Sequence, residues 1–565
     1  MVRLYQDDDV QQAHLDVFLQ ARSVPAPCLP PGLSEAQFSD VIRELKSIVG
    51  EANIHTGQSL LHFSDPFAFH QDKFPSAAVC PKSVEEITRV LALANARHFP
   101  LWTVSRGKNL GYGGPSPRVA GSVVLSLHRM DCILEVNERS SHAVVEPGVT
   151  FLDLYNHCRA AKLAVWPSVP AIAWGSVLGN TLDRGFGYTA LGDHHNHICG
   201  MEVVLPDGDI VRTGQWAVDG SPSAFACKSQ FGPQVDGLFL QSNLGVVTKL
   251  GIRLQSQPEA TMAVSLEMPE LDDLGSLIEV LGQLRRDDVL QNDPSIYDVS
   301  RRISQLGPRH AVYQGPGALP DALVADLIAK HGWHYWKAWF SFYGTKAAIE
   351  ARLAATEAAL ARLANPSTAR LTHRLFEGSG PGSRVDAASI PDEWQPMNAG
   401  VPTIKFASTL NYNTAPGGHG GHVDFSPILP YDGALALRWY RDAVVLCRSF
   451  GFDSFLCVHA FRSHAVFVHM LLFDRTNPEH VVAADALWHA LADKAREYGF
   501  AKYRTHLDYM DAVQDSYDFN GNAYRRFVET LKDALDPNGI LSPGKSGIWP
   551  KGYRDERQKA GAQDE

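Results

Sequence analysis

A chain of 565 residues is too long for one hydrophobic core, so we expect two or more domains. Hydrophobic residues make up 45% of it and charged residues 20%, as in a globular protein, and the net charge of −11 argues against nucleic acid or an anionic membrane as a partner. No apolar run is long enough to span a bilayer, and eight cysteines without C-x-x-C spacing indicate reduced thiols in an intracellular protein.

The first part of the chain mixes helices with short strands. The first ten residues carry three consecutive aspartates and no apolar segment, so we expect no secretory signal and a cytoplasmic location. A helix is predicted over 34–49, with Ser34 and Gln37 as a capping box, and a second helix begins at Ser83 and runs to about Asn95. Strand-like runs lie at 77–80, 101–105, 122–127 and 143–146. Because regular β-α-β alternation is missing, the pattern indicates an α+β domain.

A glycine-rich loop from Ser105 to Gly114 follows the strand-like run at 101–105. Its four glycines allow positive φ angles and close approach to a ligand, and successive N–H groups in such a loop can bind an anion such as a diphosphate. It is not the Rossmann fingerprint, because no G-x-G-x-x-G leads into a helix, and Lys108 does not stand in a Walker motif. A plain turn between strands is the alternative.

Two more glycine-containing loops follow, over 174–188 and 241–251, and the second runs into a predicted strand. Taken alone, both could be hairpins. From about Leu254 the pattern changes to amphipathic helices, such as 346–363, which indicates a second domain. No internal repeat is visible.

With Pro115 to Val119, the first loop resembles the phosphate-binding loop of the vanillyl-alcohol oxidase family. These FAD-dependent phenol-oxidising enzymes include eugenol oxidases and the flavoprotein subunit of p-cresol methylhydroxylase. The other two loops and the tail at 536–549 resemble the family in the same order. The resemblance implies an α+β, two-domain FAD-binding fold with an α+β cap domain, and a homodimer or larger homo-oligomer. Its expected segments are an FAD-binding domain with an N-terminal arm at 1–255, a substrate or cap domain at 256–500, and a return to the FAD domain at 501–565.

The resemblance also implies which residues bind FAD. They come from the three loops and the tail: Ser105, Arg106, Gly107, Lys108, Asn109, Gly113, Gly175, Ser176, Asn180, Gly245, Val247 and Lys545. His422, in Gly420-Gly-His-Val-Asp-Phe-Ser-Pro427, stands where the family's oxidases bond a histidine covalently to the flavin.

Oxidation of a para-substituted phenol at its benzylic carbon is hydride transfer to FAD, and it needs the phenolate, whose charge drives formation of a p-quinone methide. A site for it must supply a cation and hydrogen-bond donors to one oxygen. Tyr112, Tyr503 and Arg504 match the family's phenolate-binding residues. Taken alone, Tyr-Arg is a common dipeptide with no special role.

The sequence departs from the family at the catalytic base. The family's oxidases place an aspartate near the flavin in a segment that here reads Val169 to Ser176, and Ala171 stands at that place. Alanine cannot transfer protons. Asp424, two residues after His422, is our candidate for a relocated base; the alternative is a salt-bridged Asp424 and no carboxylate base.

The histidines at 194, 195 and 197 lack supporting ligands, so we expect a hydrogen-bonded loop and no metal. One of His459, His464 and His469 is a candidate to line the pocket. The favoured function is oxidation of 4-alkylphenols, vanillyl alcohol or eugenol-type phenols, with O2 as acceptor and H2O2 as product. The alternatives are a dehydrogenase subunit that passes electrons to a cytochrome, and a flavoprotein without turnover.

Overall fold

The structure is a computed structural model that describes residues 8–67, 73–380 and 382–561. The first seven residues, on which the expectation about a secretory signal partly rests, lie outside these ranges. Within the described ranges, no helix is both long enough and apolar enough to cross a membrane.

The N-terminal part forms a four-stranded sheet with two helices. Helix α2 (Glu35–Val49) begins at Ser34, whose capping box with Gln37 is confirmed, and α3 (Val84–Arg97) begins at Ser83 and ends two residues beyond the predicted end. The strands, in the order β1-β2-β4-β3, are β1 (Ile54–His55), β2 (Ala77–Val79), β4 (Val123–Ser126) and β3 (Leu101–Val104). The glycine-rich loop therefore leaves the C-terminal end of an edge strand.

An antiparallel sheet of five strands packs beside the first. Its order is β5 (Ile133–Asn137), β6 (His142–Val145), β10 (Val246–Arg253), β8 (Ile198–Val204) and β9 (Ile210–Arg212). Helix α4 (Phe151–Ala160) and the short helix α5 (Val177–Leu182) share a hydrophobic core with it. The loop at 174–188 thus contains a helix and is not the hairpin considered as the alternative. Strands β7 (Val165–Trp166) and β11 (Gln255–Ser256) form a separate pair.

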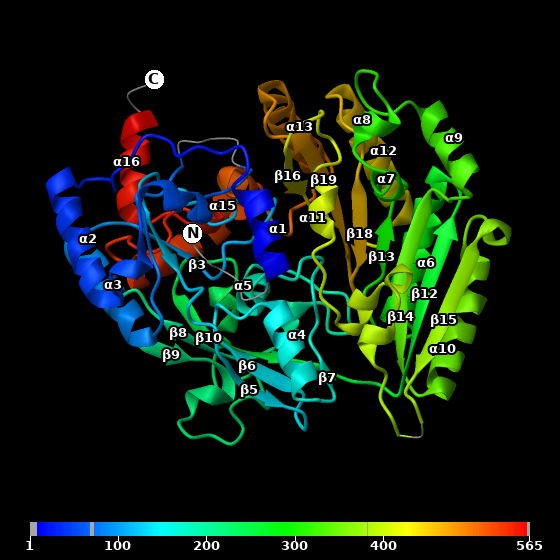
Figure 1. The fold of residues 1–565 in the computed structure, drawn as a ribbon, viewed down its shortest axis with the longest axis horizontal. Coiled ribbons are helices and arrows are strands. Elements are labelled where there is room, and N and C mark those ends of the chain that lie inside the picture. The colour runs from blue at the N-terminus through cyan, green and yellow to red at the C-terminus, as the bar shows by residue number, and fades with distance from the viewer. Residues whose placement is uncertain (1–7, 68–72, 381, 562–565) are drawn as a thin grey trace.

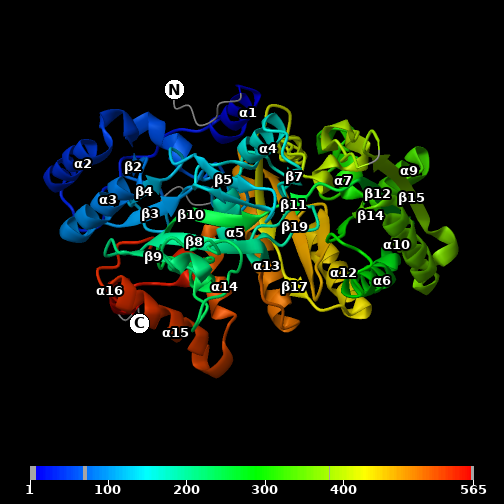
Figure 2. The same ribbon diagram turned by 90° about the horizontal axis from the view of Figure 1, so that it is seen from below.

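The second domain is built on one large antiparallel sheet. Its order is β15 (Arg370–Glu377), β12 (Ala260–Met268), β14 (Trp336–Gly344), β13 (Ser295–Tyr297), β18 (Leu456–Ala460), β19 (Ala465–Asp474) and β16 (Gly420–Phe425), and β17 (Ile428–Leu429) also pairs with β19. Its main helices are α6 (Leu274–Arg286), α10 (Lys346–Ala359), α12 (Gly433–Ser449) and α13 (Pro478–Glu497), which follow the sheet in Figures 1 and 2. The edge strand β16 carries His422 and Asp424.

The C-terminal segment returns to the N-terminal sheets, as Figures 1 and 2 show for α16 (Lys551–Gly561). Leu541 bridges Leu101 in parallel, and the Leu101 N–H donates to the Ile540 carbonyl at 2.7 Å. Every strand of the large sheet lies between residues 260 and 474. We therefore retain the division at residues 255 and 500 as a proposal, which this distribution of strands supports.

A buried lysine fastens the returning segment. In α15 (Phe519–Leu535), the fully buried Lys532 ammonium donates to the carbonyls of Asn243 and Leu541, at 2.7 Å each, and pairs with buried Asp536 at 2.6 Å. Removing one partner of a buried pair costs about 3–5 kcal/mol, because the other charge stays uncompensated.

We predict that Lys532→Met lowers the free energy of unfolding by about that amount, measured by urea denaturation of the holoprotein. Lys551→Met is the matched control, since Lys551 forms an exposed i,i+4 pair with Asp555 and should change stability by less than about 1 kcal/mol. Equal stability of the two variants would contradict the fastening role.

Candidate active site

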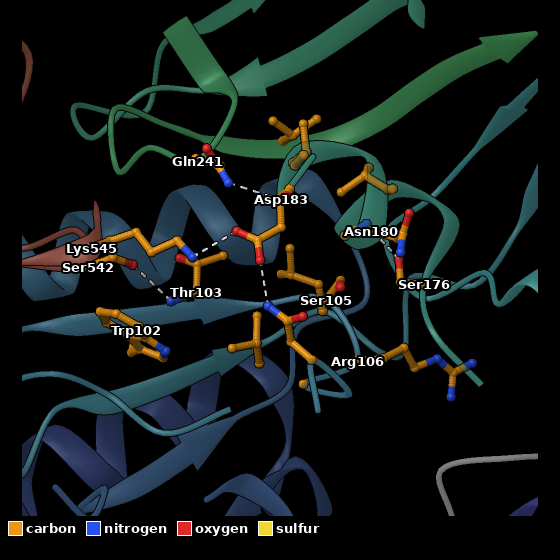
Figure 3. A pocket seen from close by; sticks show the side chains of 18 of the residues that line it. Trp102, Thr103, Ser105, Arg106, Ser176, Asn180, Asp183, Gln241, Ser542 and Lys545 are labelled. Atoms are coloured by element: carbon orange, nitrogen blue, oxygen red, sulfur yellow. Dashed lines mark hydrogen bonds and ion pairs between the residues drawn. The ribbon is translucent and has the colours of Figure 1, made fainter. Parts of the chain in front are cut away.

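A long cavity lies between the glycine-rich loop, α5, the start of β10 and the segment at 541–545 (Figure 3). Nearly all the predicted cofactor residues line it: Ser105, Arg106, Gly107, Lys108, Asn109, Gly175, Ser176, Asn180, Gly245, Val247 and Lys545. Tyr112 lines it too. Of the predicted cofactor residues, Gly113 and His422 do not line it, and of the predicted catalytic residues, Tyr503, Arg504 and Asp424 do not.

Two glycines of the loop are required by close packing. A Cβ on Gly111 (φ +77°) would lie 2.6 Å from the His422 ring, and a Cβ on Gly113 (φ +104°) would lie 2.2 Å from Leu507. Both distances are shorter than any van der Waals contact, and both φ values favour glycine. Gly113 therefore lets the loop pack on the segment after Arg504, and Gly111 brings the loop against His422.

The carboxylate of Asp183 organises the charges at one end of the cavity (Figure 3). It pairs with Lys545 at 3.0 Å and with Arg504 at 2.9 Å, and it accepts from the Asn109 amide. Burial alone would raise the pKa of Asp183, but Lys545 and Arg504 hold it at about 2. Asp183 is therefore ionised, and it fixes both cations.

The three predicted phenolate ligands lie together. The Arg504 guanidinium donates to the Tyr503 hydroxyl at 3.3 Å, and its carbon lies 4.0 Å from the centre of the Tyr112 ring. Burial raises the pKa of Tyr112 well above its usual range, with the Asp424 charge adding to the effect, and burial also raises the pKa of Tyr503. Both tyrosines thus keep their protons and can donate hydrogen bonds beside a permanent cation.

His422 and Asp424 face the glycine loop from β16. Both side chains are buried, and His422 Nε2 lies 2.7 Å from a carboxylate oxygen of Asp424. Among the described residues, His422 Nδ1 has no hydrogen-bond partner, and it lies 2.8 Å from the position of a Cβ on Gly111. A buried ring nitrogen without a hydrogen-bond partner can interact with a ligand held in the loop.

An aromatic wall continues from Tyr503 into the second domain. The Phe186 ring centre lies 5.9 Å from that of Tyr503 and 3.9 Å from that of His459. Of the three candidate histidines, His459 therefore lies nearest the phenolate ligands, while His469 accepts a hydrogen bond from buried Trp439 at 2.9 Å. Ala171 lines a second cavity, together with Tyr188.

The histidine cluster at 194–197 contacts a side chain of α5 and an acidic side chain of its own loop. His194 Nδ1 lies 2.7 Å from the Asn180 side-chain oxygen, and His195 Nδ1 lies 2.6 Å from Asp193. Within the described ranges, no group of three histidine, cysteine or acidic side chains is placed to hold a metal ion.

The first cavity fits FAD. Small residues and backbone N–H groups of the loop suit a diphosphate, and the open nitrogen of His422 faces the same loop. The chain matches the family described as "FAD binding domain" over residues 75–214 and "FAD linked oxidases, C-terminal domain" over 414–546. Fold and site together define an FAD-dependent oxidoreductase.

Two similar sequences and one similar structure identify the family more precisely. The chain is 30% identical over 534 residues to the 4-cresol dehydrogenase [hydroxylating] flavoprotein subunit of Pseudomonas putida, covering 92% of this chain and 97% of that protein. It is 28% identical over 540 residues to the 1'-carboxy-chondrochloren decarboxylase of Chondromyces crocatus, covering 89% and 97%. The structure of 4-ethylphenol oxidase from Gulosibacter chungangensis superposes with a TM-score of 0.86 at 31% identity, over 93% of this chain and all of that one. The chain belongs to the vanillyl-alcohol oxidase and p-cresol methylhydroxylase family of phenol-oxidising flavoproteins.

Three site residues are missing from the sequence prediction. Asp183 and Gln241 both lie in loops that the sequence analysis singled out, yet a lone acid or amide in such a loop carries no signal of its role. Gln241 donates to the Tyr503 carbonyl at 3.0 Å, and Ser426 lies 3.5 Å from the Tyr112 hydroxyl. These contacts join residues far apart in the chain, which is why local patterns do not predict them.

Proposed function

We propose that this protein oxidises para-substituted phenols at the benzylic carbon and uses O2 as electron acceptor, with H2O2 as product. The observation that carries the proposal is the buried group of two neutral tyrosines and one arginine, because it suits a single phenolate oxygen. The ligand class is a 4-alkylphenol, a vanillyl alcohol or a eugenol-type phenol.

The chain's own residues bind and polarise the phenol. Tyr112 and Tyr503 donate hydrogen bonds to the phenolate oxygen, while Arg504 stabilises its negative charge. Asp183 keeps the guanidinium in place, so little reorganisation is needed when the charge develops. FAD, when bound, would supply the two-electron oxidant for removal of the benzylic hydride, and O2 would be the final electron acceptor. The substrate is thereby converted to a p-quinone methide.

The alternative is a dehydrogenase that passes its electrons to a cytochrome subunit. In the family, that type links its flavin through a tyrosine, whereas this chain carries His422 in the oxidase-type segment. Hydrogen peroxide released during aerobic oxidation of 4-ethylphenol would support the oxidase. Turnover only with an artificial electron acceptor would support the alternative, and no flavin reduction by any phenol would contradict both.

The phenolate site gives a direct prediction. A hydrogen bond to a charged group is worth about 1.5–3 kcal/mol, or roughly ten- to a hundredfold in rate. Arg504→Ala and Tyr503→Phe should slow flavin reduction by 4-ethylphenol by about that factor and leave FAD bound, because Asp183 keeps Lys545 and Asn109 as partners. Anaerobic stopped-flow absorbance measures the rate. Full activity of Arg504→Ala, or equal rates with the O-methylated substrate, would contradict the phenolate mechanism.

We propose that His422 bonds covalently to the flavin, since its Nδ1 is buried, open among the described residues and turned toward the glycine loop. Acid precipitation of the wild type should leave yellow flavin in the pellet, and His422→Ala should release it to the supernatant. His419→Ala is the control, because His419 lies three residues away and should retain the flavin in the pellet. Wild-type flavin found only in the supernatant would show that the linkage is absent.

We propose Asp424 as the base that replaces the carboxylate missing at Ala171. Its charge contributes to the raised pKa of both Tyr112 and Tyr503, and its backbone N–H lies 3.5 Å from the carbonyl of Gly111, the residue before Tyr112, which supports this proposal. Asn at position 424 can still accept a hydrogen bond from His422 but cannot take a proton. General-base help is worth about 10²–10⁴-fold, so Asp424→Asn should bind FAD and lose most turnover.

Adding Ala171→Asp to the Asp424→Asn variant should restore part of that turnover, measured with vanillyl alcohol at saturating oxygen. Two results would count against the base role. One is wild-type turnover in Asp424→Asn. The other is loss of covalent flavin in that variant, which would assign Asp424 to the flavin linkage instead.

A further inference from the structure

A second cavity of about 780 Å³ runs from Ala171 and Tyr188 of the first domain into the second domain, where Tyr297, Arg301 and Trp339 line it. This volume is within the range of small-molecule sites. Four basic residues line it, Arg301, Arg302, Lys337 and Lys405, together with three acidic residues, Asp298, Asp392 and Glu393.

Three of these four basic side chains form ion pairs. Arg302 and Lys337 both pair with buried Glu267, and Lys405 pairs with Asp392. Arg301, in the short helix α7 (Ser300–Ser304), is the exception, since among the described residues no carboxylate lies within ion-pair distance of it. Its guanidinium carbon lies 4.2 Å from the centre of the Tyr297 ring.

The groups around Arg301 do not neutralise it. Its titratable neighbours are Tyr297, Tyr188 and Cys457. Burial raises the pKa of both tyrosines and raises that of Cys457 to about 12, so all three are uncharged near neutral pH. Asp298 also lines the cavity, but its carboxylate accepts from the Tyr440 hydroxyl and from the Leu456 and Ser300 N–H groups.

The aromatic wall connects the surroundings of Arg301 with the predicted phenolate ligands. The Tyr188 ring centre lies 5.7 Å from that of His459, which contacts Phe186 and, through it, Tyr503. The Tyr188 ring centre also lies 6.4 Å from that of Phe186, which contacts Tyr503. Tyr188, Ala171 and Arg301 line one cavity, so this cavity adjoins the aromatic wall that ends at Tyr503.

We propose that Arg301 binds a carboxylate at the end of the substrate's para side chain, so that the preferred substrates are 4-hydroxyphenyl acids with a short side chain. Arg301 is half-buried and lines the cavity without a counter-charge among the described residues, and a planar carboxylate is the natural bidentate partner of a guanidinium. Ala171 presents no negative charge that would repel such a ligand. This inference rests on the proposed phenol oxidation and deepens it by naming the substrate class.

Binding is tested on the holoenzyme with a matched pair of ligands, 4-hydroxycinnamate and its methyl ester. Their ring-attached side-chain carbon is already sp2 and cannot lose a hydride to form a p-quinone methide. Their dissociation constants are measured from the change in flavin absorbance. The wild type should bind the acid about tenfold or more tightly than the ester, and Arg301→Gln should lose that preference. Arg301→Lys should retain part of it. Arg302→Gln is the control and should retain all of it, because Glu267 keeps Lys337 and Arg370 as partners.

Flavin reduction gives the second readout. The wild type should be reduced by 3-(4-hydroxyphenyl)propanoate at lower concentrations than by its methyl ester, and Arg301→Gln should remove the difference while reduction by 4-ethylphenol continues. Equal binding of acid and ester by the wild type, or equal weakening of both in Arg301→Gln, would overturn the proposal. If 4-ethylphenol also fails to reduce the wild-type flavin, the phenol oxidation itself fails, which is a distinguishable result.

Discussion

The half-buried carboxylate of Asp183 makes the ion pairs on which the arrangement of the site depends. It holds Arg504, Lys545 and Asn109, which come from three segments of the chain that are far apart in sequence. Burying a carboxylate is costly unless nearly all its hydrogen-bonding capacity is used, and here two cations and an amide use it. Two cations share this one carboxylate, so Arg504 keeps part of its charge beside Tyr112 and Tyr503. This fixed cation supports the proposed phenolate site, because it is in place before any ligand binds.

A steric constraint complements this electrostatic one. His422 and Asp424 belong to the edge strand of the second domain's sheet, whereas the glycine loop belongs to the first domain. The two meet because Gly111 has no side chain where the His422 ring lies. A larger residue at position 111 would therefore keep the His422 imidazole of the second domain away from the loop. The position of Asp424 beside the phenolate ligands depends on the same contact.

Features that depend on residues close together in the chain could be predicted from the sequence. Ser34 with Gln37 and Ser83 mark helix starts because capping involves residues three apart, and the glycine loops were found because their resemblance lies in continuous segments. The strand order of the large sheet was not predictable, since it joins β13 to β18 across about 160 residues, a pairing that no local pattern encodes. Asp183 was missed for the same reason, as its role comes from partners at positions 109, 504 and 545. Arg301 was missed because its distinguishing feature is the lack of a partner among the described residues, which only a three-dimensional structure shows.

Two arginines bear on the proposal that Asp424 replaces the acid missing at position 171. Asp183 compensates the charge of Arg504. A phenol that binds there as a phenolate must therefore give its proton to another group. Arg301 is uncompensated, and it shares a cavity with Ala171. An aspartate at position 171 would place a negative charge in that cavity, where it would attract the guanidinium or repel an anionic side chain. With alanine there, Arg301 faces no carboxylate from position 171, and the base that we propose for the phenol site is Asp424, on the wall formed by β16. On this view, moving the base and selecting an acidic side chain are two consequences of the same change in the electrostatics of the cavity.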